Sequence, residues 1–117
     1  MGTFVYGSGA LRVEFDDRVL AHLQAVIGVK IRRNERFFFS WFDTQAVGDG
    51  RSAAWIAPEV PLAFRFTTAS QHRLNRGWVE AMILSAGSPA GLVLTQEPDT
   101  GDQVLSEDNS VKRNERT

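Results

Sequence analysis

The stretch FFFSWF, which begins at Phe37, constrains the fold most strongly, because it places five aromatic residues within six positions. Successive side chains of a β-strand point to opposite faces of a sheet. In a strand, Phe37, Phe39 and Trp41 therefore share one face. Phe38 and Phe42 share the other. One set of rings can enter a core, and the opposite set then needs cover of its own.

Period-2 alternation also predicts strands at 4–7, 11–15, 51–58, 61–67 and 91–98, in addition to the aromatic strand at 36–42. After Phe15 the spacing changes to that of a helix, which should end near Arg33. Its apolar stripe consists of Leu20, Leu23, Ile27 and Ile31. Asn75 is the predicted N-cap of a second helix, which Gly87 should end.

The resulting element order, ββαβββαβ, predicts an α+β fold in which both helices pack on one face of a mostly antiparallel sheet. The chain has 117 residues and is 43% hydrophobic, which suits one domain. From Asp99 onward the sequence is polar. We therefore expect a single domain over 1–98 and a flexible tail over 99–117.

Composition argues against several classes of function. The chain has no cysteine, which removes disulfides and thiolate chemistry. Its two histidines, His22 and His72, have no partner at metal-ligand spacing, and we expect both at the solvent or at a helix edge. No apolar run is long enough to cross a membrane, and the first residues do not resemble a signal peptide. We expect a cytoplasmic protein without a metal or a cofactor.

The motifs of common enzymes are also missing. Asp16 and Asp17 stand where a helix begins, so helix capping explains them better than acid–base chemistry. The glycines at 7–9 and 48–50 do not form a phosphate-binding loop, and no serine lies in a nucleophile elbow. The sequence does not predict an enzyme.

Four segments, DDRVLAHLQ, KIRRNERFFFSW, GDGRSAAWI and LNRGWVEAM, are similar to those of a known family. Over residues 1–98 the chain resembles small actinobacterial proteins of unknown function, found mainly in microbacteria and often labelled "ATP-dependent DNA ligase". The resemblance implies a compact intracellular domain and no catalytic residues. Such a ligase needs a lysine in a K-x-D-G motif. Neither Lys30 nor Lys112 stands in one, so we interpret the label as mistaken.

The predicted working surface is the sheet face opposite the helices, centred on Phe38, Phe42 and Arg65, with Trp55 as a further candidate beside them. Exposed apolar faces of this kind are commonly contact surfaces. We therefore favour a small non-catalytic interaction module that forms a homodimer or binds a protein partner. Cover by a loop or by the tail is a second explanation.

The alternative is a single-stranded nucleic-acid binder or an accessory protein of DNA metabolism. In that hypothesis the rings stack on bases and nearby cations bind phosphates. The candidate cations are Lys30, Arg32, Arg33 and Arg36. The net charge of -1 makes this alternative the weakest of the three.

Overall fold

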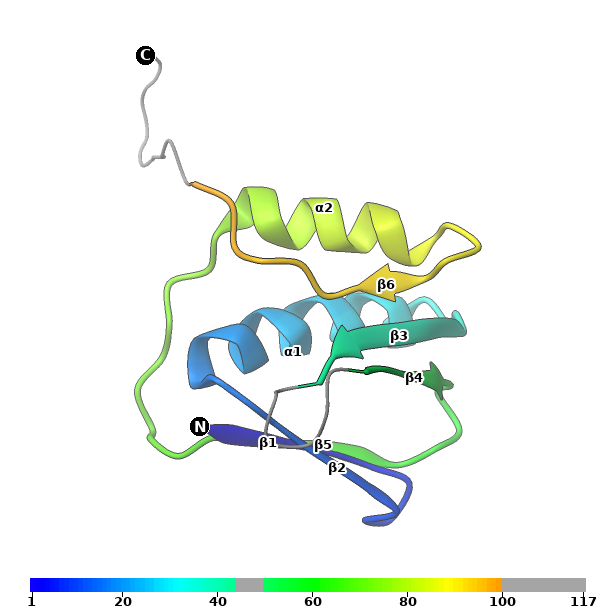
Figure 1. Cartoon of the computed structure of the whole chain (residues 1–117), viewed down its shortest axis with the longest axis horizontal. Coiled ribbons are helices and arrows are strands. Elements are labelled where there is room, and N and C mark those ends of the chain that lie inside the picture. Colours follow the sequence, from blue (N-terminus) through cyan, green and yellow to red (C-terminus); the bar gives the residue numbers. More distant parts are fainter. Residues whose placement is uncertain (44–49, 100–117) are drawn as a thin grey trace.

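The computed structural model describes residues 1–43 and 50–99, and it confirms an α+β fold in the order ββαβββαβ (Figure 1). The interior of the turn expected at 43–50 and the tail from residue 100 onward lie outside the described residues. The elements are β1 (Gly2–Tyr6), β2 (Leu11–Phe15), α1 (Asp17–Arg32), β3 (Phe37–Phe42), β4 (Arg51–Ile56), β5 (Leu62–Arg65), α2 (Arg76–Ala86) and β6 (Leu92–Val93).

The strands divide into two three-stranded sheets, where the sequence suggested one. The β1 sheet has the antiparallel order β2-β1-β5. The β3 sheet has the order β4-β3-β6, in which β4 is antiparallel and β6 parallel to β3. The division falls between Ile56 and Leu62, where Pro58 and Pro61 interrupt the chain. Proline has no amide donor, so this connection does not extend the β4 ladder. Gly7 N donates to Pro61 O instead, at 2.8 Å, and so joins the connection to the β1 sheet.

One tyrosine joins the two sheets. The hydroxyl of Tyr6 in β1 donates to the carbonyl oxygen of Trp55 in β4 at 2.5 Å. The same hydroxyl accepts a hydrogen bond from Ala57 N at 3.1 Å. The edge of β4 is therefore connected to the β1 sheet by a side chain and not by a backbone ladder.

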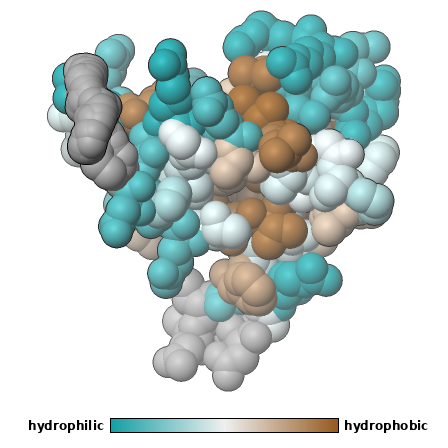
Figure 2. All heavy atoms as spheres, turned by 90° about the horizontal axis from the view of Figure 1, so that it is seen from above, coloured by the Kyte–Doolittle hydropathy of each residue, from teal (hydrophilic) through white to brown (hydrophobic). Residues whose placement is uncertain are grey.

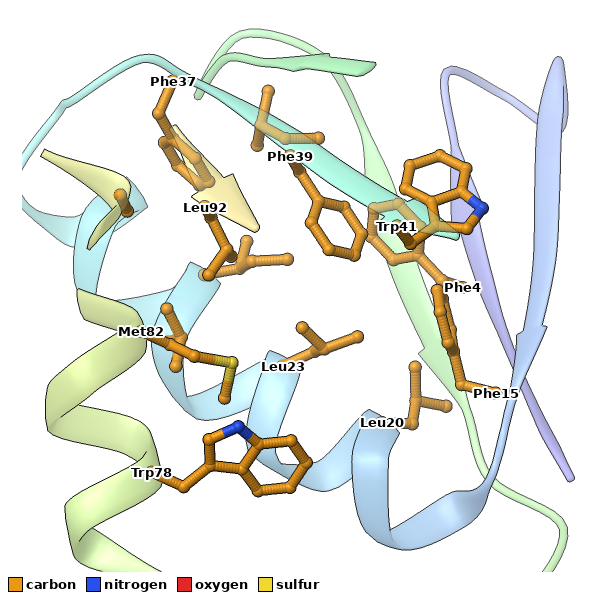
Figure 3. Packing of buried hydrophobic residues seen from close by; sticks show 14 residues of the cluster. Phe4, Phe15, Leu20, Leu23, Phe37, Phe39, Trp41, Trp78, Met82 and Leu92 are labelled. Atoms are coloured by element: carbon orange, nitrogen blue, oxygen red, sulfur yellow. The ribbon is translucent and has the colours of Figure 1, made fainter. Parts of the chain in front are cut away.

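Both sheets and both helices enclose one core (Figure 3). The rings of Phe4 in β1 and Phe39 in β3 meet edge to face, with centroids 5.8 Å apart. Leu23 of α1 and Trp78 of α2 approach from the helices, and both are buried. The predicted inner set of the aromatic strand thus lies in the core, and the helices lie behind the inner side of the β3 sheet.

The first helix has its predicted ends but not its predicted cap. Asp16 is the N-cap residue, yet its side chain makes no capping hydrogen bond. Asp17 instead accepts hydrogen bonds from Thr67 N and Thr67 Oγ1, at 3.2 and 2.7 Å from its Oδ2. It therefore joins the helix to the segment after β5. Beyond the other end of the helix, Asn34 has a φ of 59°, the left-handed conformation expected there.

The second helix has the predicted cap, whereas the last strand is shorter than predicted. Asn75 Oδ1 accepts a hydrogen bond from Trp78 N at 3.2 Å. The strand expected over 91–98 pairs with β3 only at Leu92 and Val93. Leu94 N still donates to Ser40 O of β3 at 3.0 Å, whereas Thr95 and Glu97 bind the side chains of Trp78 in α2 and Arg18 in α1.

Candidate functional site

The outer surface of the β3 sheet carries three partly exposed rings, and we call this surface the aromatic face. It comprises the outward residues of β3 and β4, which are Phe38, Ser40, Phe42, Arg51, Ala53 and Trp55. Phe38, Phe42 and Trp55 are 47%, 68% and 51% exposed. The β-strand period places them opposite the buried rings of the same sheet. The local alternation that fills the core therefore also leaves these rings outside it.

The pairing of β3 with β4 arranges the aromatic face in three rows. Phe38 is opposite Trp55, Ser40 opposite Ala53, and Phe42 opposite Arg51. Asp43 N donates to Gly50 O at 2.9 Å, so Asp43 and Gly50 form a hydrogen-bonded pair. From there, non-hydrogen-bonded and hydrogen-bonded pairs alternate along the antiparallel ladder.

By this alternation Phe38 and Trp55 form a non-hydrogen-bonded pair, in which side chains lie closer together. Their ring centroids are 5.0 Å apart with an interplanar angle of 66°. Each ring covers part of the other, whereas Phe42 lies opposite Arg51 and is the most exposed of the three.

Arg65, which the sequence analysis grouped with these rings, lies in the other sheet. It belongs to β5 and is paired with Thr3 of β1, which is in turn paired with Glu14 of β2. The outer surface of the β1 sheet therefore carries charged and hydroxyl side chains, of which Arg65 and Glu14 are exposed. The structure brings Phe38, Phe42 and Trp55 together and leaves Arg65 out.

Two of the four candidate phosphate-binding cations are paired with carboxylates. Lys30 is only 6% exposed, and its Nζ lies 2.5 Å from Glu35 Oε1. Arg36 Nη2 donates to Glu59 Oε2 at 2.8 Å. These hydrogen bonds lower the pKa of the Glu35 and Glu59 carboxyl groups. Arg32 and Arg33 are exposed and have no ion pair within the part of the chain that the structure describes.

A pocket of about 470 Å³ opens beside Phe42 at the end of β3. Its lining is partly apolar and partly charged, and consists of Asp16, Arg18, Val19, Phe42, Trp78, Leu94, Thr95, Gln96 and Glu97. Arg18 and Glu97 are bound to each other there, with Arg18 Nε and Nη2 donating to the two carboxylate oxygens at 2.8 and 2.7 Å. The pocket thus contains no paired nucleophile and base among its lining residues.

Next to this pocket lies a group that we call the polar cluster, formed by Arg18, His22, Asn75 and Glu97. His22 was expected at the solvent or at a helix edge, but it is completely buried. Val19 and Val26 stand three positions before and four positions after it, so they form with His22 a second stripe that faces inward. This spacing is the signal in the sequence that could have placed His22 correctly.

Both ring nitrogens of His22 have a partner. Nδ1 lies 2.7 Å from Arg18 O, and Nε2 accepts a hydrogen bond from Asn75 N at 2.7 Å. Because Asn75 N can only donate, Nε2 is unprotonated and the ring is neutral with its proton on Nδ1. Burial lowers the pKa of His22, which agrees with the neutral form. The ring of Trp78 lies against it, with centroids 4.7 Å apart.

Asn75 and Glu97 complete the polar cluster. Asn75 Nδ2 donates to Glu97 Oε2 and to Pro98 O, each at 3.0 Å. The hydrogen bonds from Arg18 lower the pKa of Glu97 to about 2. The polar cluster therefore holds the start of α2 and the segment after β6 against α1, and its internal partners explain it as a structural feature.

The remaining surface offers fewer candidates. A second pocket, of about 570 Å³, lies between α1 and the residues after β5, and its lining includes Gln24, Arg32 and His72. Figure 2 looks down on the α2 side, where apolar side chains form a broken band among hydrophilic ones. Leu84 of α2 is 81% exposed, and no large exposed apolar residue accompanies it within α2.

Within residues 1–43 and 50–99, no group of three or more acidic or histidine side chains is arranged to hold a metal ion. The described helices are also too short or too polar to cross a membrane. The aromatic face is thus the feature that the internal contacts of the described residues leave unexplained.

Comparison with known proteins gives one match. A family model described as Domain of unknown function (DUF7882) matches residues 1–97. No curated protein and no solved structure matches the chain.

Proposed function

The chain belongs to this DUF7882 family of unknown function, and we propose that it acts as a small, non-catalytic interaction module in the cytoplasm. Its contact surface in this proposal is the aromatic face, which binds a second copy or another protein. The observation that carries the proposal is the exposure of Phe38, Phe42 and Trp55 on one sheet surface. Large exposed apolar patches of this kind mark contact sites.

Charge supports a protein contact over a nucleic-acid contact. Phosphate binding needs cations that are available on the same surface as the rings. Lys30 is buried against Glu35, and Arg36 is bound to Glu59, so carboxylates accompany two of the four cations. Arg32 and Arg33 support the alternative, a single-stranded nucleic-acid binder that stacks bases on the rings.

Salt separates the two hypotheses. Apolar association holds or tightens as salt rises, whereas phosphate binding weakens steeply. Light scattering of the wild type and of Phe38→Asp, at low and high salt and with a labelled single-stranded oligonucleotide, tests both. We expect concentration-dependent self-association that salt does not weaken and that Phe38→Asp removes. A monomer that binds the oligonucleotide only at low salt would replace the proposal by its alternative.

We also propose an actinobacterial origin, and we regard the ligase label of the proteins that this chain resembles as a mistaken transfer. A ligase lysine must reach the α-phosphate of ATP. Lys30 is buried and paired, which opposes such a reaction. Incubation with labelled ATP should leave no acid-stable adduct on the protein. An adduct that disappears in Lys30→Ala would contradict this interpretation.

A further inference from the structure

We infer that the pocket between α1 and the segment after β5 binds a small carboxylate with an apolar body, and that Arg32 binds its charged group. We call it the α1 pocket. Its volume of about 570 Å³ lies within the range of pockets that hold small molecules. It shares no residue with the aromatic face, so the inference goes beyond the proposed function and does not depend on it.

The segment between β5 and α2 is fastened to α1 at both ends, and its middle forms one wall of the α1 pocket. At one end, Thr67 N and Oγ1 donate to Asp17 Oδ2. At the other end, Arg73 O accepts a hydrogen bond from Arg18 Nη1 at 2.9 Å. Between them, the backbone of residues 69–72 makes no hydrogen bond to another described backbone group. Both ends of the wall are therefore fixed, and its middle keeps polar backbone groups for a ligand.

The floor of the α1 pocket is a side of the helix that carries small residues. Ala21 and Ala25 line the pocket, and Gly28 continues the same side by the i, i+4, i+7 spacing. Small side chains leave depth between the helix and the wall. Phe66 and Leu74 add apolar surface to the lining. This part of the pocket therefore suits the apolar body of a ligand.

Arg32 supplies the charge of the α1 pocket. Side chains of a helix lean toward its N-terminus. A Cβ added to Gly28 would stand 3.4 Å from Arg32 Nη1, so the guanidinium lies beside Gly28, one turn back, and lines the pocket. Arg32 makes no ion pair with a described residue, and none of the described residues that line the pocket is Asp or Glu. A cation without a neighbouring carboxylate is complementary to an anionic ligand.

The lining favours a carboxylate over a phosphate. The planar guanidinium matches the two oxygens of a carboxylate. A phosphate monoester carries nearly two negative charges at neutral pH, whereas Arg32 is the one permanent cation among the described lining residues. Gln24 and Ser70 add neutral polar groups. In the pocket beside Phe42, by contrast, Arg18 is already bound to Glu97.

The test is a titration of the isotope-labelled full chain with phenylbutyrate, followed by nuclear magnetic resonance. Phenylbutyrate joins a carboxylate to an aromatic ring by a short alkyl chain. We expect saturable shifts in the amide signals of residues 69–72 and in the side-chain signals of Arg32. Phenylbutanamide has the same apolar body without the charge, and it should bind about tenfold more weakly. Arg32→Ala should weaken the binding of phenylbutyrate by a similar factor.

Arg33→Ala is the matched control, because Arg33 is the neighbouring exposed arginine and does not line the α1 pocket. Its affinity for phenylbutyrate should equal that of the wild type. Circular dichroism of both variants confirms that they are folded.

Three outcomes would overturn the inference. They are equal affinity for the acid and the amide, equal losses in the two arginine variants, and no saturable binding of phenylbutyrate to the wild type. Shifts centred on Phe38, Phe42 and Trp55 would place the ligand on the aromatic face and would also contradict it. Self-association enters none of these measurements, so this inference and the proposed function fail or succeed separately.

Discussion

The aromatic face and the polar cluster both gather residues that suggest function, and they differ in how completely the molecule itself satisfies them. In the polar cluster, His22 has a partner on each ring nitrogen, and Glu97 is bound by Arg18 and Asn75. On the aromatic face, Phe38 and Trp55 cover each other only in part, and Phe42 stays mostly exposed.

This difference separates a structural site from a candidate contact surface. A buried polar group costs free energy unless it is hydrogen-bonded, so a fully bonded group needs no ligand to explain it. Burial of an exposed apolar ring lowers the free energy, whichever group covers the ring. Residues of the polar cluster should therefore govern stability, and residues of the aromatic face should govern association.

The largest expected effect is on the polar cluster. His22→Ala would leave Asn75 N without its acceptor and open a cavity beside Trp78, so we expect a loss of about 3–4 kcal/mol in the free energy of unfolding. Urea denaturation measures it. His72→Ala is the matched control, since His72 is only half-buried, and it should cost less than about 0.5 kcal/mol. Equal losses in the two variants would mean that the polar cluster has no special role.

A smaller effect is expected from acid. The pKa of Glu97 is lowered to about 2, so its stabilising contribution is complete above about pH 4.5 and is lost as the pH falls toward 2. Arg18 is 36% exposed and water screens the ion pair, so we expect a loss of only about 1 kcal/mol between pH 5 and pH 3. The variant Glu97→Gln has no ionisable carboxyl group at this position and therefore lacks this pH-dependent contribution to stability.

The stability difference between the wild type and Glu97→Gln should therefore shrink over that interval. A difference independent of pH would contradict the role given to Glu97. The lowered pKa of His22 should also reduce the stability of the fold as the pH falls below about 6.5. Below that pH the histidine of the unfolded chain binds a proton more readily than His22 of the folded chain does.

The smallest effect on stability should come from the aromatic face. At a concentration where the protein is monomeric, Phe42→Ser should change the free energy of unfolding by less than about 0.5 kcal/mol, because Phe42 is mostly exposed. Thermal or urea denaturation at low protein concentration measures it. A loss above about 1.5 kcal/mol would place Phe42 in the core and remove the contrast between the two regions.

The element order and the inward-facing residues could be predicted because they follow from local spacing. Alternation in β3 separates Phe39 from Phe38, and helical spacing in α1 selects Leu20, Leu23 and Ile27. The cap at Asn75 and the left-handed residue at Asn34 are likewise local. The burial of His22 was missed because a polar residue in an apolar stripe can be buried only if partners are supplied, and Asn75 lies 53 positions away.

The sequence alone determined which residues of each strand and helix share a side. The backbone geometry of a strand or a helix fixes the spacing of residues on one side, and it does so over a few neighbouring residues. Only the tertiary structure decided that the strands form two sheets, that Arg65 lies apart from the exposed rings, and that Lys30 is buried against Glu35. These outcomes depend on which distant segments meet. The free energy of such meetings comes from burial and hydrogen bonding between residues far apart in the chain, which no local pattern records.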